Sequence, residues 1–241
     1  MLKNMMLEVT AILLDIEGTT TPIDFVHKTL FPFARERMLE FVQENFARIQ
    51  DQIAALHAEH AKDVAKGENP PPFDETSVES ITAYLHFLID QDRKSTVLKS
   101  LQGQIWKNGY ESGELKGEMF SEVPSAFKRW KAEGKTIAIF SSGSVLAQKL
   151  IFQFSIAGNL TEFISAYFDT TTGPKREAAS YQKIAEDLNF QPNEILFVSD
   201  VIAELDAAAK AGMQTRLAIR PNNIPIDEPT AHIAVYNFEE I

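Results

Sequence analysis

The sequence of 241 residues contains no cysteine. Disulfide bonds, thiolate nucleophiles and cysteine-ligated zinc sites are therefore excluded, and we expect a cytoplasmic protein in a reducing compartment. Long apolar runs are also missing, because the stretch from Leu7 to Leu14 is interrupted by Glu8 and ends at Asp15. That stretch is too short to span a bilayer and lacks a signal-peptide cleavage pattern. We expect no membrane partner.

Basic residues are scarce, with 23 Lys and Arg against 34 Asp and Glu and a formal net charge of -11. A charge of this sign disfavours binding along a phosphate backbone, so we expect no nucleic-acid partner. Hydrophobic residues make up 44% of the chain, enough for a substantial core. The length fits one α/β domain that carries an insertion, or two small domains. We expect a monomer.

Short apolar runs rich in β-branched residues alternate with helical patterns over the ends of the chain. The runs predict buried strands at residues 9–14, 136–140, 195–199 and 215–219. The patterns between them predict helices at residues 124–133, 145–154, 175–188 and 202–210. This alternation is typical of a doubly wound, mostly parallel sheet of the Rossmann-like kind, with helices on both faces.

Residues 22–117 interrupt the alternation with helical periods at 25–60 and 77–102 and almost no strand signal. The prolines in the segment 67–72 predict a loop between the two periods. We therefore expect a helical cap domain at 22–117, inserted into a core domain formed by 1–21 and 118–241. His57 and His60 lie in the first period and are interpreted as solvent-facing residues rather than metal ligands.

Asp15 and Glu17 follow the first apolar run and precede Gly18. Carboxylates are costly to hold at the end of a buried strand, so this pair suggests a site with concentrated negative charge and a cation. An aspartate there can act as a nucleophile toward phosphorus, with its neighbour two positions on pointing the same way. An ordinary turn with two acidic residues is the alternative for this segment taken alone.

Polar residues also follow the second predicted strand. Ser141, Ser142, Gly143 and Ser144 connect this strand to a helix, where backbone N–H groups and hydroxyls can bind a phosphate. For Ser144 we prefer an ordinary helix N-cap. Lys175 opens the third helical pattern, where a cation opposes the helix dipole, and this suggests an anionic partner such as a phosphate oxygen or Asp15.

A second acidic strand end lies at Asp200, and Glu204 follows it on the next helix. Carboxylate oxygens are the ligands that Mg²⁺ prefers, with waters and a substrate phosphate completing the shell. Glu204 could orient Asp200 or a metal-bound water from the second shell. Together these segments predict a phosphoryl-transfer site in which Mg²⁺ and Lys175 offset the repulsion between Asp15 and a phosphate.

The order of an aspartate, a serine, a lysine and a second aspartate at these positions resembles the haloacid dehalogenase superfamily. The sequence Asp-Ile-Glu-Gly-Thr-Thr-Thr-Pro-Ile at 15–23 more narrowly resembles the enolase-phosphatases (acireductone synthases) of methionine salvage, as do residues 141–150 and, in the insertion, 92–94, 101–103 and Trp106. The resemblance implies a Mg²⁺ enzyme, with one ion per subunit. Its implied activity is to enolise 2,3-dioxo-5-methylthiopentyl 1-phosphate and then remove the phosphate to leave the acireductone.

By position, the resemblance implies Asp15 as nucleophile and metal ligand, and Glu17 as acid/base residue and metal ligand through its backbone carbonyl. Asp200 is implied as the remaining metal ligand, and Ser141, Ser142 and Lys175 as phosphate contacts. The catalytic set is thus Asp15, Glu17 and Lys175.

Two other functions remain open from the sequence. The same core fits a haloacid dehalogenase-type phosphatase for another small phosphomonoester, which would differ only in the cap. A phospho-receiver or binding module is the alternative from a different class, but Glu17 and the large insertion argue against it, because a lid is most useful for excluding water.

Overall fold

The computed structural model describes residues 8–226 and 229–241 of the chain. The chain divides into two compact units. One combines the chain up to Val26 with the chain from Lys116 onward, and the other runs from His27 to Leu115. Among the described residues, no helix is both long enough and apolar enough to cross a membrane.

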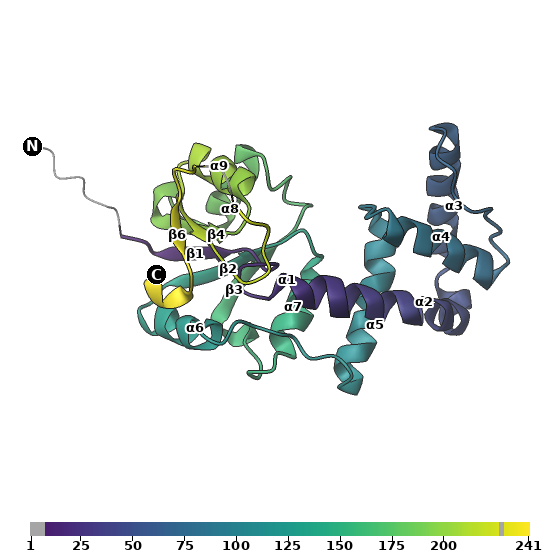
Figure 1. Ribbon diagram of the computed structural model, residues 1–241, viewed down its shortest axis with the longest axis horizontal. Helices are drawn as coiled ribbons and strands as arrows, with labels where there is room; N and C mark the ends of the chain where they lie inside the picture. Colours follow the sequence, from purple (N-terminus) through teal and green to yellow (C-terminus); the bar gives the residue numbers. More distant parts are fainter. Residues whose placement is uncertain (1–7, 227–228) are drawn as a thin grey trace, which may run out of the picture. The chain divides into compact units, whose positions relative to one another are not determined.

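The first unit is built on a parallel sheet of six strands in the order β3-β2-β1-β4-β5-β6 (Figure 1). The strands are β1 (Ala11–Leu14), β2 (Thr136–Phe140), β3 (Ile164–Phe168), β4 (Ile195–Ser199), β5 (Gln214–Ala218) and β6 (Ile233–Val235). β1 pairs with β2 on one side and with β4 on the other, so the strand order reverses at β1. The doubly wound α/β fold is confirmed, and such sheets bind ligands beside the carboxyl ends of the strands at this reversal.

The helices of this unit connect the strands and cover both faces of the sheet. They are α1 (Ile23–Phe25), α6 (Val123–Ala132), α7 (Val145–Gln153), α8 (Ala178–Leu188) and α9 (Ile202–Lys210). Figure 1 shows α8 and α9 on one side of the sheet and α6 and α7 on the other. Short 3₁₀ turns at Thr161–Phe163, Pro192–Glu194 and Phe238–Glu240 complete the unit.

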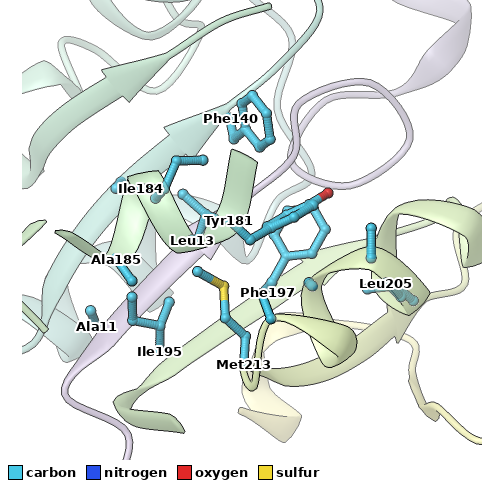
Figure 2. Packing of buried hydrophobic residues seen from close by; sticks show 14 of the residues in the cluster. Ala11, Leu13, Phe140, Tyr181, Ile184, Ala185, Ile195, Phe197, Leu205 and Met213 are labelled. Atoms are coloured by element: carbon cyan, nitrogen blue, oxygen red, sulfur yellow. The ribbon is translucent and has the colours of Figure 1, made fainter. Parts of the chain in front are cut away.

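Side chains alternate across the sheet as strand geometry requires. Leu13 of β1 and Phe197 of β4 lie in register and face α8 and α9, where Tyr181 and Leu205 pack against them (Figure 2). The ring of Tyr181 contacts Phe197 with centroids 5.1 Å apart. This core fixes the strand ends that carry the acidic residues.

Most predicted elements of the core are confirmed, and the differences lie at element ends. β2, β4 and α9 have the predicted bounds, whereas β5 begins one residue earlier than expected. α8 begins at Ala178 and not at Lys175, so the lysine lies in the turn before the helix, and its placement at a helix N-terminus was wrong. β6 was not predicted, because its three residues form a partly exposed edge strand without an apolar run.

The second unit is helical. A π-helical segment, Val26–Leu30, leads into α2 (Phe31–Asn45), and the 3₁₀ turn Phe46–Arg48, α3 (Gln50–Ala65), α4 (Val78–Asp90) and α5 (Thr96–Ser112) follow. The predicted loop at 67–72 is confirmed, since no helix forms between Ala65 and Val78. The solvent-facing interpretation of His60 was wrong, because its ring is half-buried and lies 5.0 Å from the ring of Tyr84.

A buried ion pair joins α3 to the turn after α4. Asp63 is 1% exposed and accepts hydrogen bonds from Arg93 Nη2 at 2.7 Å and from the Tyr84 hydroxyl at 2.8 Å. Burial favours the neutral acid, but the hydrogen bonds from Arg93 and Tyr84 outweigh it and hold the pKa of Asp63 below its ordinary value of 3.8. The ionised form of Asp63 therefore stabilises this unit.

Replacing Asp63 by alanine should lower the free energy of unfolding by about 3 kcal/mol at neutral pH, because Arg93 and Tyr84 lose their acceptor. Since the folded-state pKa of Asp63 is lowered, its contribution is complete above pH 3.8 and disappears as the pH falls through the folded-state value. Urea unfolding followed by circular dichroism at several pH values checks this. Lys62→Ala, on the exposed side of the same helical turn, is the matched control; equal effects of the two changes would contradict the prediction.

Candidate active site

Acidic residues meet at the carboxyl ends of β1 and β4. Asp15 follows β1 directly, and its backbone N–H donates to Val198 of β4 at 3.0 Å. Ser199 ends β4, and its hydroxyl donates to Asp15 Oδ2 and to Glu204 Oε2, both at 3.2 Å. Asp15 and Glu204 are 3% and 8% exposed. The structure therefore brings together residues that follow β1 and β4, next to the point where the strand order reverses.

Lys175 lies between these carboxylates. Its Nζ is 2.7 Å from Asp15 Oδ1 and 2.7 Å from Glu204 Oε2, and the residue is only 7% exposed. Burial disfavours the charged ammonium group, yet the carboxylates, first Asp15 and then Glu204, outweigh burial and raise the pKa of Lys175. The lysine is thus a permanent cation within an acidic cluster.

The turn that carries Lys175 is fixed by the first residues of α8. The Tyr181 hydroxyl donates to the carbonyl of Lys175 at 2.7 Å, and the Ser180 hydroxyl donates to the carbonyl of Pro174 at 2.7 Å. Tyr181 is itself buried between the aromatic rings of Phe140 and Phe197. The hydrophobic core therefore positions the lysine.

Glu17 faces the end of β2 rather than β4. The Ser141 hydroxyl donates to the two carboxylate oxygens of Glu17 at 3.3 and 3.2 Å, and Ser141 Oγ accepts from the Gly143 N–H at 3.0 Å. Burial and then the charge of Asp15 raise the pKa of Glu17, although Lys175 opposes this. Glu17 is consequently a carboxyl group that can carry a proton next to Asp15.

Asp200 lies against the turn after Glu17. A Cβ atom on Gly18 would be 2.5 Å from Asp200 Oδ2, so only glycine allows this approach. Burial and then the charge of Asp15 raise the pKa of Asp200 to about 7, and burial and Asp15 raise the pKa of Glu204 to about 7. Lys175 lowers both pKa values, but burial and the charge of Asp15 together outweigh it.

The remaining predicted site residues lie in the turn after β2 and on α9. The Ser144 hydroxyl accepts from the Ala147 N–H at 3.3 Å, so its assignment as the N-cap of α7 is confirmed. Ser142 lies in the turn between β2 and α7, beside Ser141. Glu204 contacts Lys175 and Ser199, and its predicted role of orienting Asp200 or a metal-bound water stays a prediction.

Comparison with known proteins identifies the family. Residues 9–212 match the haloacid dehalogenase-like hydrolase family. The chain is 52% identical over 235 residues to the enolase-phosphatase E1 of Synechococcus elongatus, covering 97% of this chain and 98% of that protein. It is 46% identical to the enolase-phosphatase E1 of Sorangium cellulosum over 96% of each chain. The chain belongs to the enolase-phosphatase E1 family of haloacid dehalogenase-like hydrolases.

A solved structure supports the same relationship. The UTR4 protein of Saccharomyces cerevisiae superposes with a TM-score of 0.81 at 34% identity and covers 97% of this chain and 100% of that chain. The resemblance inferred from the residues is thereby confirmed, and the protein is a hydrolase of the phosphatase type. Hydrolases of this family generally use a divalent metal ion.

The residues of this enolase-phosphatase site fit such an ion. Asp15 and Asp200 offer hard carboxylate oxygens of the kind that divalent cations prefer. Burial and then the charge of Asp15 raise the pKa of Asp200, and a bound cation would offset the charge of Asp15. Within residues 8–226 and 229–241, no three Asp, Glu or His side chains converge as a metal site.

Two residues near the site were missed from the sequence. Arg220, which follows β5, is 7% exposed and donates through Nε to the Thr19 carbonyl at 3.2 Å. Asn223 donates through Nδ2 to the Gly18 carbonyl at 2.9 Å. Both follow β5, the strand that pairs with β4. Their position after a predicted strand is the feature of the sequence that could have identified them as site residues.

Gly18→Ala should displace Asp200 and lower the activity at least tenfold, because the new Cβ would lie within 3 Å of its carboxylate. The backbone at Gly18 also has a φ of 71°, which costs alanine about 1 kcal/mol. Gly134→Ala is the matched control, since its φ is 78° and nothing lies within 4 Å of its Cβ position. Phosphate release and thermal unfolding of both variants measure the two effects; full activity of Gly18→Ala would contradict the prediction.

Proposed function

We propose that this protein converts 2,3-dioxo-5-methylthiopentyl 1-phosphate to the acireductone 1,2-dihydroxy-3-oxo-5-methylthiopentene and phosphate, in methionine salvage. The observation that carries the proposal is the buried ion pair of Asp15 with Lys175, with the half-buried Asp200 and Glu17 beside it, in a chain that is 52% identical to an enolase-phosphatase. Glu17 belongs to the segment 15–23, on which the resemblance to the enolase-phosphatases was based.

The proposed cofactor is one Mg²⁺ per subunit, held by the side chains of Asp15 and Asp200 and the main-chain carbonyl of Glu17. When bound, the ion neutralises charge on the phosphoryl oxygens and so lets an anionic nucleophile approach. The known preference of Mg²⁺ for oxygen ligands agrees with this donor set.

Asp15 acts as the nucleophile in the proposed phosphatase step. The Ile16 N–H donates to its Oδ1 at 2.8 Å, and Lys175 and Ser199 hold the same carboxylate, so its orientation is fixed before the substrate arrives. A bond forms between a carboxylate oxygen of Asp15 and phosphorus while the ester bond from phosphorus to the leaving oxygen breaks. The product of this step is an aspartyl phosphate.

Glu17 moves the protons in this scheme. Because its pKa is raised, Glu17 can donate a proton to the leaving oxygen. It then takes a proton from the water that attacks the aspartyl phosphate, and the bond between phosphorus and Asp15 breaks to release phosphate. One residue thus serves as acid and then as base.

The phosphate contacts in the proposal are Ser141, Ser142 and Lys175. We also propose that the helical insertion, predicted at 22–117, serves as a cap that excludes water from the reaction. The protein acts in this proposal as a cytoplasmic monomer whose partner is the small phosphorylated diketone.

Asp15→Asn should lower phosphate release by roughly a thousandfold or more, because the amide is a poor nucleophile toward phosphorus. The assay measures inorganic phosphate from the diketone phosphate at saturating Mg²⁺. Asp187→Asn changes an exposed acidic residue of α8 in the same way and should keep wild-type activity. Substantial turnover by Asp15→Asn, with circular dichroism showing an intact fold, would remove Asp15 from the nucleophile role.

Ultraviolet spectroscopy separates the bifunctional enzyme from a plain phosphatase. With the diketone phosphate, enol or acireductone absorbance should rise together with phosphate release. A phosphate ester of equal length that lacks the two ketones is the control, and it should be hydrolysed much more slowly. Release of phosphate without the absorbance, or equal rates for the two esters, would favour the alternative of a phosphatase for another small phosphomonoester.

A further inference from the structure

Asn223 has a fixed amide orientation beside the acidic cluster. Its Nδ2 donates to the carbonyl oxygen of Gly18 at 2.9 Å. A carbonyl oxygen can only accept, so the amide nitrogen must be the atom at the Gly18 carbonyl, and this leaves Oδ1 as the other terminal atom of the amide. The direction of Oδ1 is therefore set by the main chain of the turn that follows Glu17.

The amide oxygen of Asn223 is buried and has no hydrogen-bond partner in the part of the chain that the structure describes. It also lies close to Asp200. A Cβ built on Gly18 would be 2.8 Å from Asn223 Oδ1 and 2.5 Å from Asp200 Oδ2, so the two oxygens approach the same point next to Gly18. An amide oxygen without a donor and a carboxylate oxygen that both approach one point match a ligand that carries O–H or N–H groups or positive charge.

The same two residues line one cavity. It has a volume of about 170 Å³ and is otherwise lined by Ala218, Ile219, Arg220, Ile224, Pro225 and Ile226. A space of this size holds several water molecules, each of which needs polar partners. The isoleucine and proline side chains offer none, so polar contacts with water here involve mainly Asp200, Asn223 and Arg220.

We propose that Asn223 is a positioning residue of the cation site, whose Oδ1 accepts a hydrogen bond from a water in the hydration shell of the divalent ion held by Asp200. The inference rests on the cofactor of the proposed function. Mg²⁺ keeps several of its waters in protein sites, and residues that bind those waters tune the affinity for the ion. Through Nδ2, the same side chain also anchors Gly18, which gives Asp200 the space for its close approach.

Calorimetric titration of the full-length, substrate-free protein with MgCl₂ tests this role without any dependence on catalysis. Asn223→Ala should weaken Mg²⁺ binding by about tenfold or more, the range typical of lost second-shell partners. Asn223→Asp keeps an oxygen toward Asp200 and should bind Mg²⁺ at least as tightly as the wild type.

Asn222→Asp is the matched control for the added charge. Asn222 is exposed, donates to Asp24 at 3.0 Å, and has a φ of 66° that aspartate tolerates. Because both aspartate variants add the same charge to neighbouring positions, Asn223→Asp should bind Mg²⁺ at least as tightly as Asn222→Asp. Circular dichroism of each variant establishes that the fold is kept, and the isosteric Asn223→Asp provides a test even if Asn223→Ala unfolds.

Unchanged Mg²⁺ affinity of Asn223→Ala would overturn the inference. Weaker binding by Asn223→Asp than by Asn222→Asp would also overturn it, because only the amide contact to Gly18 would then matter. Both outcomes would leave the proposed function intact. Absence of Mg²⁺ binding by the wild type is a different result, visible before any variant is made, and it would remove the proposed cofactor together with this inference.

Discussion

The ion pairs of Lys175 with Asp15 and Glu204, each at 2.7 Å, are the interactions on which the site depends. Buried carboxylates at adjacent strand ends repel one another, and burial alone favours their neutral forms. A buried ammonium group between two of them offsets part of this repulsion and holds both in place. Lys175 in turn depends on Tyr181, whose hydroxyl binds its carbonyl and whose ring is packed in the core (Figure 2). The packing of the hydrophobic core thereby holds the positive charge of Lys175 in position between the carboxylates.

The sequence predicted the sheet well because its central strands are buried on both faces. β1, β2 and β4 read as continuous apolar runs, and parallel pairing placed Asp15, Ser141 and Asp200 at one edge. β6 and the start of α8 were harder to predict. β6 has three residues at the edge of the sheet, and Ile233 is 56% exposed. The pattern at Pro174 and Lys175 resembles a helix start, but the Pro174 carbonyl instead accepts from the Ser180 hydroxyl.

The residues of the candidate site also divide into those that the sequence predicted and those that it did not. Asp15, Glu17, Lys175 and Asp200 carry charge at strand ends or turns, so their residue types alone drew attention to them. Asn223 and Arg220 lie in a loop after β5, and their importance comes from main-chain contacts with Gly18 and Thr19 about two hundred positions earlier. Such contacts depend on the folded path of a loop, which no periodicity records. Ser199 was predicted only as the last residue of a strand, although its hydroxyl joins Asp15 to Glu204.

The central place of β1 in the sheet has a consequence for how the chain folds during synthesis. Ala11–Leu14 is completely apolar and, within the described part of the chain, pairs with β2 and β4, which begin at Thr136 and Ile195. The ribosome must therefore complete the whole helical unit from His27 to Leu115 before the first strand finds a neighbour, a delay on the order of ten seconds at ordinary translation rates. During this interval the nascent strand is an unpaired apolar segment, which is prone to aggregation and is the kind of segment that chaperones bind. Early folding of the helical unit would draw its two ends out of the random coil and shorten the loop that β1 and β2 must close.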